Sequence, residues 1–175
     1  MELGGNAPFI IFDDADIDEA IKGVMISKYR NAGQTCVCTN RILVQHSVYD
    51  EFLSKFKAEC ENLVVGNGLG EETTIGPLIN RKAAADVKDL IEDAKSKGAI
   101  SELGENNNAY GDCYVEPTIL SNINTSMRVF REEIFGPVAP IIKFESEDEA
   151  VELANKTEFG LAAYFYSRDI GRIYR

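Results

Sequence analysis

The sequence predicts an α/β fold with a largely parallel sheet flanked by helices. Three observations carry this prediction. Short apolar runs alternate along the chain with segments of helical periodicity. The 175 residues are 45% hydrophobic and 27% charged, which suits one domain with a sizeable core. No internal repeat or low-complexity linker divides the chain.

The first half of the chain reads as strand, helix, strand and two further helices. The apolar run 9–12 is predicted as a buried strand. A helix over 16–30 follows, because acids at 13–16 supply a cap and apolar residues recur at helical spacing. The alternating run 41–45 is predicted as a strand. Amphipathic periodicity then predicts the two helices, over 48–63 and 80–97.

The next segment is predicted to be mostly extended. Residues 99–103 are predicted as a strand and 104–112 as a surface loop. Residues 115–120 are predicted as an edge strand or an extended segment, because Pro117 cannot donate to a strand ladder.

The last part of the chain returns to alternation. Residues 138–144 are predicted as a strand, and a capping box at Ser146 begins a helix that ends near 155. A strand over 161–167 follows, and a final helix begins near Asp169. The chain stops inside that helix and starts abruptly before its first strand, so we expect it to be cut from something larger.

Charge and hydropathy narrow the class of protein. The net charge of −11 argues against a nucleic-acid surface, where clustered Lys and Arg neutralise phosphates. No apolar run approaches the ~18 residues of a membrane span, and no signal peptide or basic run is visible. A cytoplasmic protein without nucleic-acid or membrane partners is expected.

The most informative stretch is residues 30–41, which read RNAGQTCVCTNR and place Cys36 and Cys38 one residue apart. Four cysteines are too few for a disulfide scaffold in a chain of this length. Cys60 falls on the apolar face of a predicted helix and is expected in the core. Cys113 has no functional interpretation.

Several chemistries are disfavoured. The C-x-C pair has no second cysteine pair or histidine cluster at zinc-binding spacing, so no metal site is expected. His46 is the sole histidine and lies at a predicted strand end, where a surface position is expected rather than a role as base for Cys36. The glycine-rich run 66–70 lacks the Lys-Ser/Thr of a phosphate loop.

The sequence also allows Cys36 to be a thiol nucleophile. A cysteine in a glycine-bounded turn after a helix can be reached by solvent, and backbone N–H groups there can favour a thiolate. Glu2, just before Gly4 and Gly5, is a candidate base. From these residues alone, Cys36 as a small core residue is the commoner situation.

Four ordered motifs make the chain resemble the aldehyde dehydrogenase family. They are ELGG with a following proline (2–8), the run Y-R-N-A-G-Q-T-C (29–36), E-I-F-G-P (133–137) and FGLAAYFYS (159–167). Tyr29 stands where the second motif usually has Phe. The resemblance implies the family's catalytic domain, with a mostly parallel sheet flanked by helices.

The resemblance also implies a mechanism. Cys36 attacks an aldehyde, hydride passes to NAD or NADP, and water activated by Glu2 hydrolyses the thioester. Glu133 is implied to bind the nicotinamide ribose and Phe135 to pack near the nicotinamide. Without the resemblance, Glu133 is interpreted as a solvated acid in an acidic run. Residues 1–175 would be the catalytic (thiol) domain, truncated at both ends, without the NAD(P)-binding domain and the oligomerisation strand. The full-length protein is expected to be a homo-oligomer, and the isolated segment to be inactive.

Within the family, RNAGQTCVCTNR resembles succinate-semialdehyde dehydrogenases. Arg30 then suits the distal carboxylate of the aldehyde, although a helix-terminal arginine can also simply be solvated. Some of these enzymes use a pair such as Cys36 and Cys38 as a reversible redox switch. The alternatives are another semialdehyde dehydrogenase, or a folded segment without catalysis.

Overall fold

The computed structural model describes residues 3–104 and 110–175, and its centre is a six-stranded sheet. The strand order is β3-β4-β5-β2-β1-β6. Every neighbouring pair is parallel except β3 and β4, so the predicted fold class is confirmed. The strands are β1 (Ala7–Ile11), β2 (Thr39–Gln45), β3 (Ile100–Leu103), β4 (Thr118–Ser121), β5 (Val138–Phe144) and β6 (Tyr164–Tyr166).

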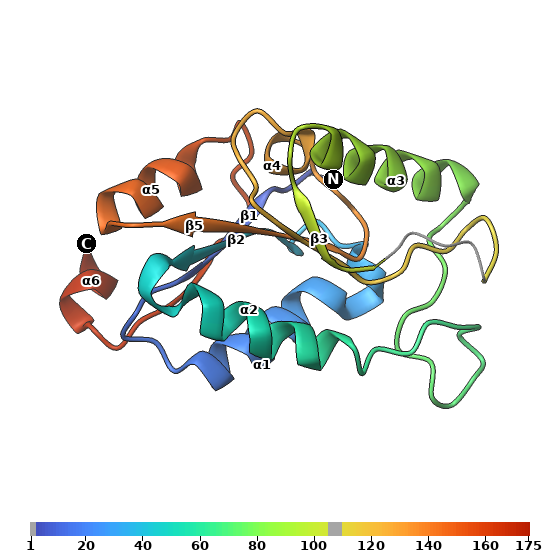
Figure 1. Ribbon diagram of the computed structural model, residues 1–175, viewed down its shortest axis with the longest axis horizontal. Helices are drawn as coiled ribbons and strands as arrows, with labels where there is room; N and C mark the ends of the chain where they lie inside the picture. The colour runs from blue at the N-terminus through green and yellow to red at the C-terminus, as the bar shows by residue number, and fades with distance from the viewer. Residues whose placement is uncertain (1–2, 105–109) are drawn as a thin grey trace.

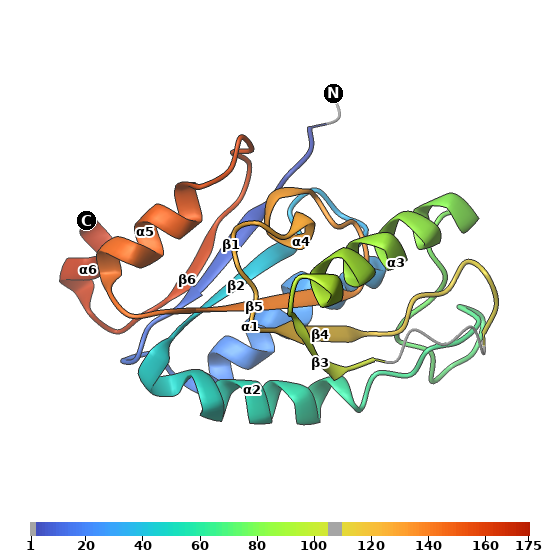
Figure 2. The ribbon, with the colours of Figure 1, turned by 45° about the horizontal axis from the view of Figure 1, so that its top comes forward.

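Helices cover both faces of this sheet. In Figure 1, α1 and α2 lie below the sheet and α3, α4 and α5 lie above it. Figure 2 turns the sheet toward the viewer, with β6 and β1 on one side and β4 and β3 on the other. The helices are α1 (Ile17–Tyr29), the 3-10 turn η1 (Arg30–Gly33), α2 (His46–Cys60), α3 (Arg81–Ser96), α4 (Arg128–Arg131), α5 (Glu147–Asn155) and α6 (Ile170–Tyr174).

The predicted helix starts are confirmed by their caps. The side chains of Asp16, Asn80, Ser146 and Asp169 each accept a hydrogen bond from a backbone N–H in the first turn of their helix. Such a cap satisfies an N–H group that the helix itself cannot. These residues therefore begin α1, α3, α5 and α6.

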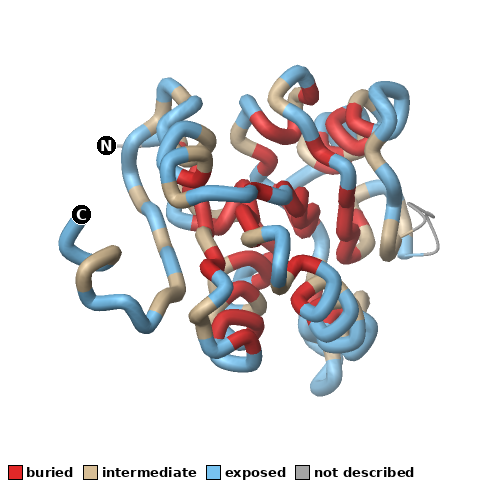
Figure 3. The backbone as a smooth tube through the Cα atoms, turned by 60° about the vertical axis from the view of Figure 1, so that its left-hand side comes forward, coloured by how far each residue is buried: buried red, intermediate tan, exposed pale blue. Residues whose placement is uncertain are grey.

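The core lies on the central strands. β2 is buried from Thr39 to Val44, and β5 is buried except at Lys143. Continuous burial of this kind is expected for parallel strands covered on both faces. Figure 3 shows buried segments gathered in the interior of the molecule, whereas none of residues 151–175 is buried.

Two sequence expectations need correction. The segment with Pro117 is not an edge strand, because β4 lies between β3 and β5. Pro117 stands just before β4 begins, so the strand needs no N–H from it. The helix predicted to reach residue 63 ends at Cys60. Of the predicted loop 104–112, residues 105–109 lie outside the described part of the chain.

Pro140 lies inside a central strand and is accommodated by the pairing. β5 pairs with β4 over Val138–Pro140 and with β2 from Ile141 to Phe144. The proline therefore lies where the strand changes partner, at a place where its missing N–H costs least.

Candidate active site

Three of the four sequence motifs meet at the amino ends of neighbouring strands. The ELGG segment directly precedes β1, the cysteine segment precedes β2, and the E-I-F-G-P segment precedes β5. These three strands are neighbours and parallel, so their amino ends lie side by side. The fourth motif leads into β6, which pairs with β1.

The backbone before Cys36 is in the left-handed region. Asn31, Ala32 and Gly33 have φ of 54°, 54° and 78°. This reversal between α1 and β2 costs roughly 1 to 2 kcal/mol at a residue such as Ala32. Gly33 is required twice over, because an added Cβ would also lie 2.2 Å from the carbonyl oxygen of Gly136.

Gln34 ties this turn to its surroundings. Its side-chain amide donates to the Asn31 carbonyl (3.1 Å), and its side-chain oxygen accepts from the backbone N–H of Ile79 (2.9 Å). The glutamine of the G-Q-T-C run therefore fixes the loop that carries Cys36.

Cys36 is half-buried and lies against the ELGG segment. A Cβ added at Gly5 would lie 2.0 Å from the carbonyl oxygen of Cys36, so only glycine allows this approach. The structure thus brings Gly5 to the candidate nucleophile. Glu2, the candidate base, lies outside the described residues.

Glu133 reaches the same junction from the third segment. The backbone N–H of Gly5 donates to its Oε1 at 3.0 Å. Glu133 and Cys36 therefore both contact Gly5. Phe135 follows with φ of 52° and is 39% exposed, which leaves an aromatic face open beside this edge of the sheet.

A cavity of about 260 Å³ lies beside the cysteine loop. Arg30, Thr35 and Val37 contribute to its wall, so it includes both neighbours of Cys36. The Tyr164 hydroxyl closes one side and donates to the Val37 carbonyl at 2.8 Å. Burial raises the pKa of this hydroxyl, and the nearby charge of Arg30 acts in the opposite direction. The structure thus places Arg30 in one cavity with the cysteine loop.

Cys38 faces the interior rather than Cys36. The residue is 7% exposed, and its thiol contacts the carbonyl oxygens of Lys28 (3.3 Å) and Thr39 (3.4 Å). The buried Lys28 ammonium donates to the Thr39 carbonyl at 3.0 Å, and burial lowers the pKa of Lys28. Both Cys36 and Cys38 are free thiols.

Three buried polar residues near the junction are missing from the sequence prediction: Asn6, Asn40 and Arg41. The Arg41 guanidinium donates to the carbonyls of Asn6, Leu153 and Ala154, at 2.7 to 3.2 Å. Burial lowers its pKa to about 10, so it is still charged at neutral pH. Arg41 thereby joins the ELGG segment to the end of α5.

The remaining candidates lie elsewhere. His46 begins α2 and lies 3.4 Å from Glu145, with 59% of its side chain exposed. Cys60 is in the core as expected, and burial raises the pKa of its thiol to about 12. Among the described residues, no group of three or more His, Cys, Asp and Glu could hold a metal ion.

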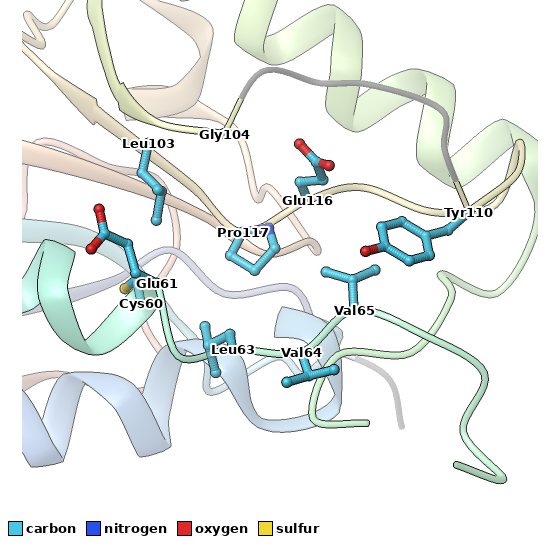
Figure 4. A pocket seen from close by; sticks show the side chains of 10 residues that line it. All are labelled: Cys60, Glu61, Leu63, Val64, Val65, Leu103, Gly104, Tyr110, Glu116 and Pro117. Carbon is cyan, nitrogen blue, oxygen red and sulfur yellow. The ribbon is translucent and has the colours of Figure 1, made fainter. Parts of the chain in front are cut away.

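A second cavity, of about 560 Å³, lies between the end of α2 and the start of β4 (Figure 4). Leu63, Val65, Leu103 and Pro117 are among the residues that line it. It contains none of the residues of the three converging segments. Within the described chain, no helix combines the length and apolar composition of a membrane span.

Comparison with known proteins shows the family of the chain. The aldehyde dehydrogenase family model matches residues 1–175. The chain belongs to the aldehyde dehydrogenase family.

Individual members of the family are similar to this chain over its whole length. The chain is 55% identical over 175 residues to a succinate semialdehyde dehydrogenase of Acinetobacter baylyi and to a 3-sulfolactaldehyde dehydrogenase of Pseudomonas putida. It also matches the crystal structure of a succinate-semialdehyde dehydrogenase from Burkholderia pseudomallei, with a TM-score of 0.98 and 55% identity. In all three comparisons, 100% of this chain covers 36% of the relative.

Proposed function

We propose that this chain is the thiol-bearing part of an NAD(P)-dependent aldehyde dehydrogenase that oxidises succinate semialdehyde to succinate. The observation that carries the proposal is the position of Cys36. Gly5 contacts both Cys36 and Glu133. Gly33, in the loop that carries Cys36, lies against the backbone of Gly136 in the Glu133 segment. The same loop borders a cavity that Arg30 also lines. Nucleophile, cofactor side and substrate cavity therefore meet at one edge of the sheet.

In the proposed reaction, the Cys36 thiolate attacks the aldehyde carbon and forms a thiohemiacetal. Glu133 and Phe135 would hold NAD(P)+, which would accept the hydride that the thiohemiacetal carbon loses as it becomes a thioester. Glu2 takes a proton from the water that attacks the thioester, which releases succinate and restores Cys36. Gly5 lets the ELGG segment lie against the backbone carbonyl of Cys36.

The residues on the cofactor side suit a nicotinamide nucleotide. The Glu133 carboxylate is an acceptor that matches a ribose hydroxyl, and the Gly5 N–H already orients its Oε1. The partly exposed Phe135 offers an aromatic face for a nicotinamide ring.

Arg30 is proposed to bind the distal carboxylate of the aldehyde. A guanidinium binds carboxylates through two parallel N–H donors, and Arg30 lines the cavity that both chain neighbours of Cys36 also line. The named relatives act on aldehydes whose other end carries a carboxylate or a sulfonate. Another anionic semialdehyde is therefore the alternative substrate. The cytoplasmic location and the homo-oligomer of the full-length enzyme are part of the same proposal.

A substrate panel tests the proposal. The vehicle is a chimera in which residues 1–175 replace the matching segment of the Acinetobacter baylyi relative. We expect kcat/KM for succinate semialdehyde to exceed that for butanal, which has the same carbon chain without the carboxylate. Equal values for the two aldehydes would contradict the proposed substrate class, and higher values for glutarate semialdehyde or 3-sulfolactaldehyde would favour the alternative.

The chain by itself is expected to give no turnover. In this proposal a large part of the NAD(P) site lies outside these residues. Mixing the isolated chain with NAD(P)+ and aldehyde, and following absorbance of the reduced cofactor, measures this. Sustained turnover would show that residues 1–175 contain a complete hydride-acceptor site.

Replacing Glu2 by glutamine in the chimera should slow hydrolysis of the thioester more than its formation. Glutamine keeps the size of the side chain but cannot take a proton from water. A burst of reduced cofactor, followed by a slower steady state, is the expected stopped-flow trace. A steady-state rate equal to that of the unmodified chimera would remove Glu2 from the mechanism.

Cys38 is proposed to protect Cys36 from irreversible oxidation. Peroxide converts the Cys36 thiolate to a sulfenic acid, and the Cys38 thiol displaces water from it to form a disulfide. For this, the Cys38 thiol must leave the carbonyls of Lys28 and Thr39, so the bridge should be strained and easily reduced.

The switch predicts a difference in recovery. After peroxide treatment, the unmodified chimera should regain activity with dithiothreitol, whereas Cys38→Ala should not. Cys113→Ala is the control, because Cys113 lies outside the junction. Equal recovery in all three proteins, or no linked Cys36–Cys38 peptide by mass spectrometry, would exclude the switch.

A further inference from the structure

The side chain of Asn40 holds the backbone on both sides of Glu133. Its Nδ2 donates to the carbonyl of Glu132 at 2.9 Å, and its Oδ1 accepts from the backbone N–H of Ile134 at 2.9 Å. Asn40 is 3% exposed, so water does not compete for these bonds. One amide thus fixes the peptide groups that flank the proposed ribose-binding carboxylate.

The same side chain is joined to the other two segments of the junction. Asn40 lies four residues after Cys36, at the start of β2. Its Nδ2 also donates to Oδ1 of Asn6 at 2.7 Å, and Asn6 directly follows the Gly5 whose N–H binds Glu133. Asn40 therefore contacts the cysteine strand, the ELGG segment and the Glu133 loop together.

We propose that Asn40 is a positioning residue that holds Glu133 in register with Cys36 for cofactor binding. The site needs an amide because a donor and an acceptor must face two different peptide groups at once. A shorter or one-sided side chain leaves a buried backbone group without its partner, and the loop can then shift. This inference rests on the proposed role of Glu133.

The test uses the chimera with Asn40→Ala and Asn40→Ser, each alone and combined with Glu133→Gln. Serine keeps a hydroxyl but cannot span both peptide groups. Val44→Ala is the matched control, because Val44 is fully buried on the same strand and lies away from the junction. Fluorescence titration of NADPH and NADH, KM for the aldehyde and thermal unfolding are measured for each protein.

We expect Asn40→Ala to weaken cofactor binding about tenfold, the effect of losing a buried hydrogen bond. KM for the aldehyde should change much less. Val44→Ala should lower the unfolding temperature without changing cofactor affinity. In the Glu133→Gln background, the effect of Asn40→Ala on cofactor affinity should largely disappear, because both changes act through the same contact.

Three results would overturn the inference. A folded Asn40 variant could bind the cofactor as tightly as the unmodified chimera, the loss could be equal with and without Glu133→Gln, or both Asn40 variants could fail to fold. If Glu133→Gln itself leaves cofactor affinity unchanged, the proposed role of Glu133 fails as well. If Glu133→Gln weakens binding and the Asn40 variants do not, the inference about Asn40 fails alone.

Discussion

Replacing Cys36 by alanine is expected to lower dehydrogenase kcat in the chimera by about 10⁴-fold or more, the scale seen when a catalytic nucleophile is removed. Without the thiol no covalent intermediate forms, and the remaining groups can only hold the reactants. Cofactor affinity should stay that of the unmodified chimera, because Glu133 and Phe135 are untouched. Steady-state kinetics and fluorescence titration measure the two effects.

Two controls make the Cys36 result specific. Cys113→Ala removes a partly exposed thiol outside the junction and should leave kcat unchanged. Iodoacetamide should label Cys36 faster than Cys60, whose thiol is buried and has a raised pKa. Residual activity of Cys36→Ala close to that of Cys113→Ala would show that another group is the nucleophile.

The second large effect is expected for Arg30→Ala, in substrate discrimination. A hydrogen bond to a charged group contributes roughly 1.5 to 3 kcal/mol, so KM for succinate semialdehyde should rise about 10- to 150-fold. KM for butanal should change little, since it has no carboxylate for Arg30 to bind. Comparing the two aldehydes on one protein separates recognition from damage to the fold.

Arg81→Ala is a matched control for this experiment. Arg81 is also an exposed arginine at a helix terminus, but it pairs with Asp112 and does not line the cavity that contains Arg30. Arg30→Lys adds a second comparison, because lysine keeps the charge and loses the planar pair of donors. An equal increase in KM for both aldehydes in Arg30→Ala would mean that Arg30 stabilises the structure of η1 and does not bind the carboxylate.

Local patterns were sufficient to predict most helices and strands. The apolar stripe of α3 is an example, since Val87, Leu90, Ile91 and Ala94 are all buried as their spacing indicates. The interior position of β4 could not be predicted, because strand order depends on contacts distant in sequence. Pro117 suggested an edge strand for a residue that lies just outside the strand.

The sequence does contain a signal, easily overlooked, that the motif segments come together in the fold. The first three motif segments stand just before β1, β2 and β5, and the fourth runs through β6, so parallel pairing gathers the first three at the amino ends of the strands. Ligands of open α/β sheets usually bind at the carboxyl ends, and that rule would have pointed to the opposite edge. The left-handed turn at 31–33 and the glycines at 4–5 allow close approach here instead.

The polar residues that support the junction could not be predicted from local sequence. Asn40 and Arg41 stand at the start of a strand, where polar residues are ordinarily solvated. Their burial arises because chain segments more than ninety residues apart close over them. Glu2 is proposed from its motif alone, because it lies outside the described residues 3–104 and 110–175.

The most direct test of the central claim is to trap the acyl group on Cys36. The chimera that carries Glu2→Gln is mixed with succinate semialdehyde and NAD(P)+. The reaction is quenched with acid during the burst, and the protein is digested and examined by mass spectrometry. The account predicts a succinyl group on the peptide that contains Cys36, absent without NAD(P)+ and absent in Cys36→Ala. A succinyl group on a different residue, or substrate turnover with Cys36 unmodified at every time point, would contradict it.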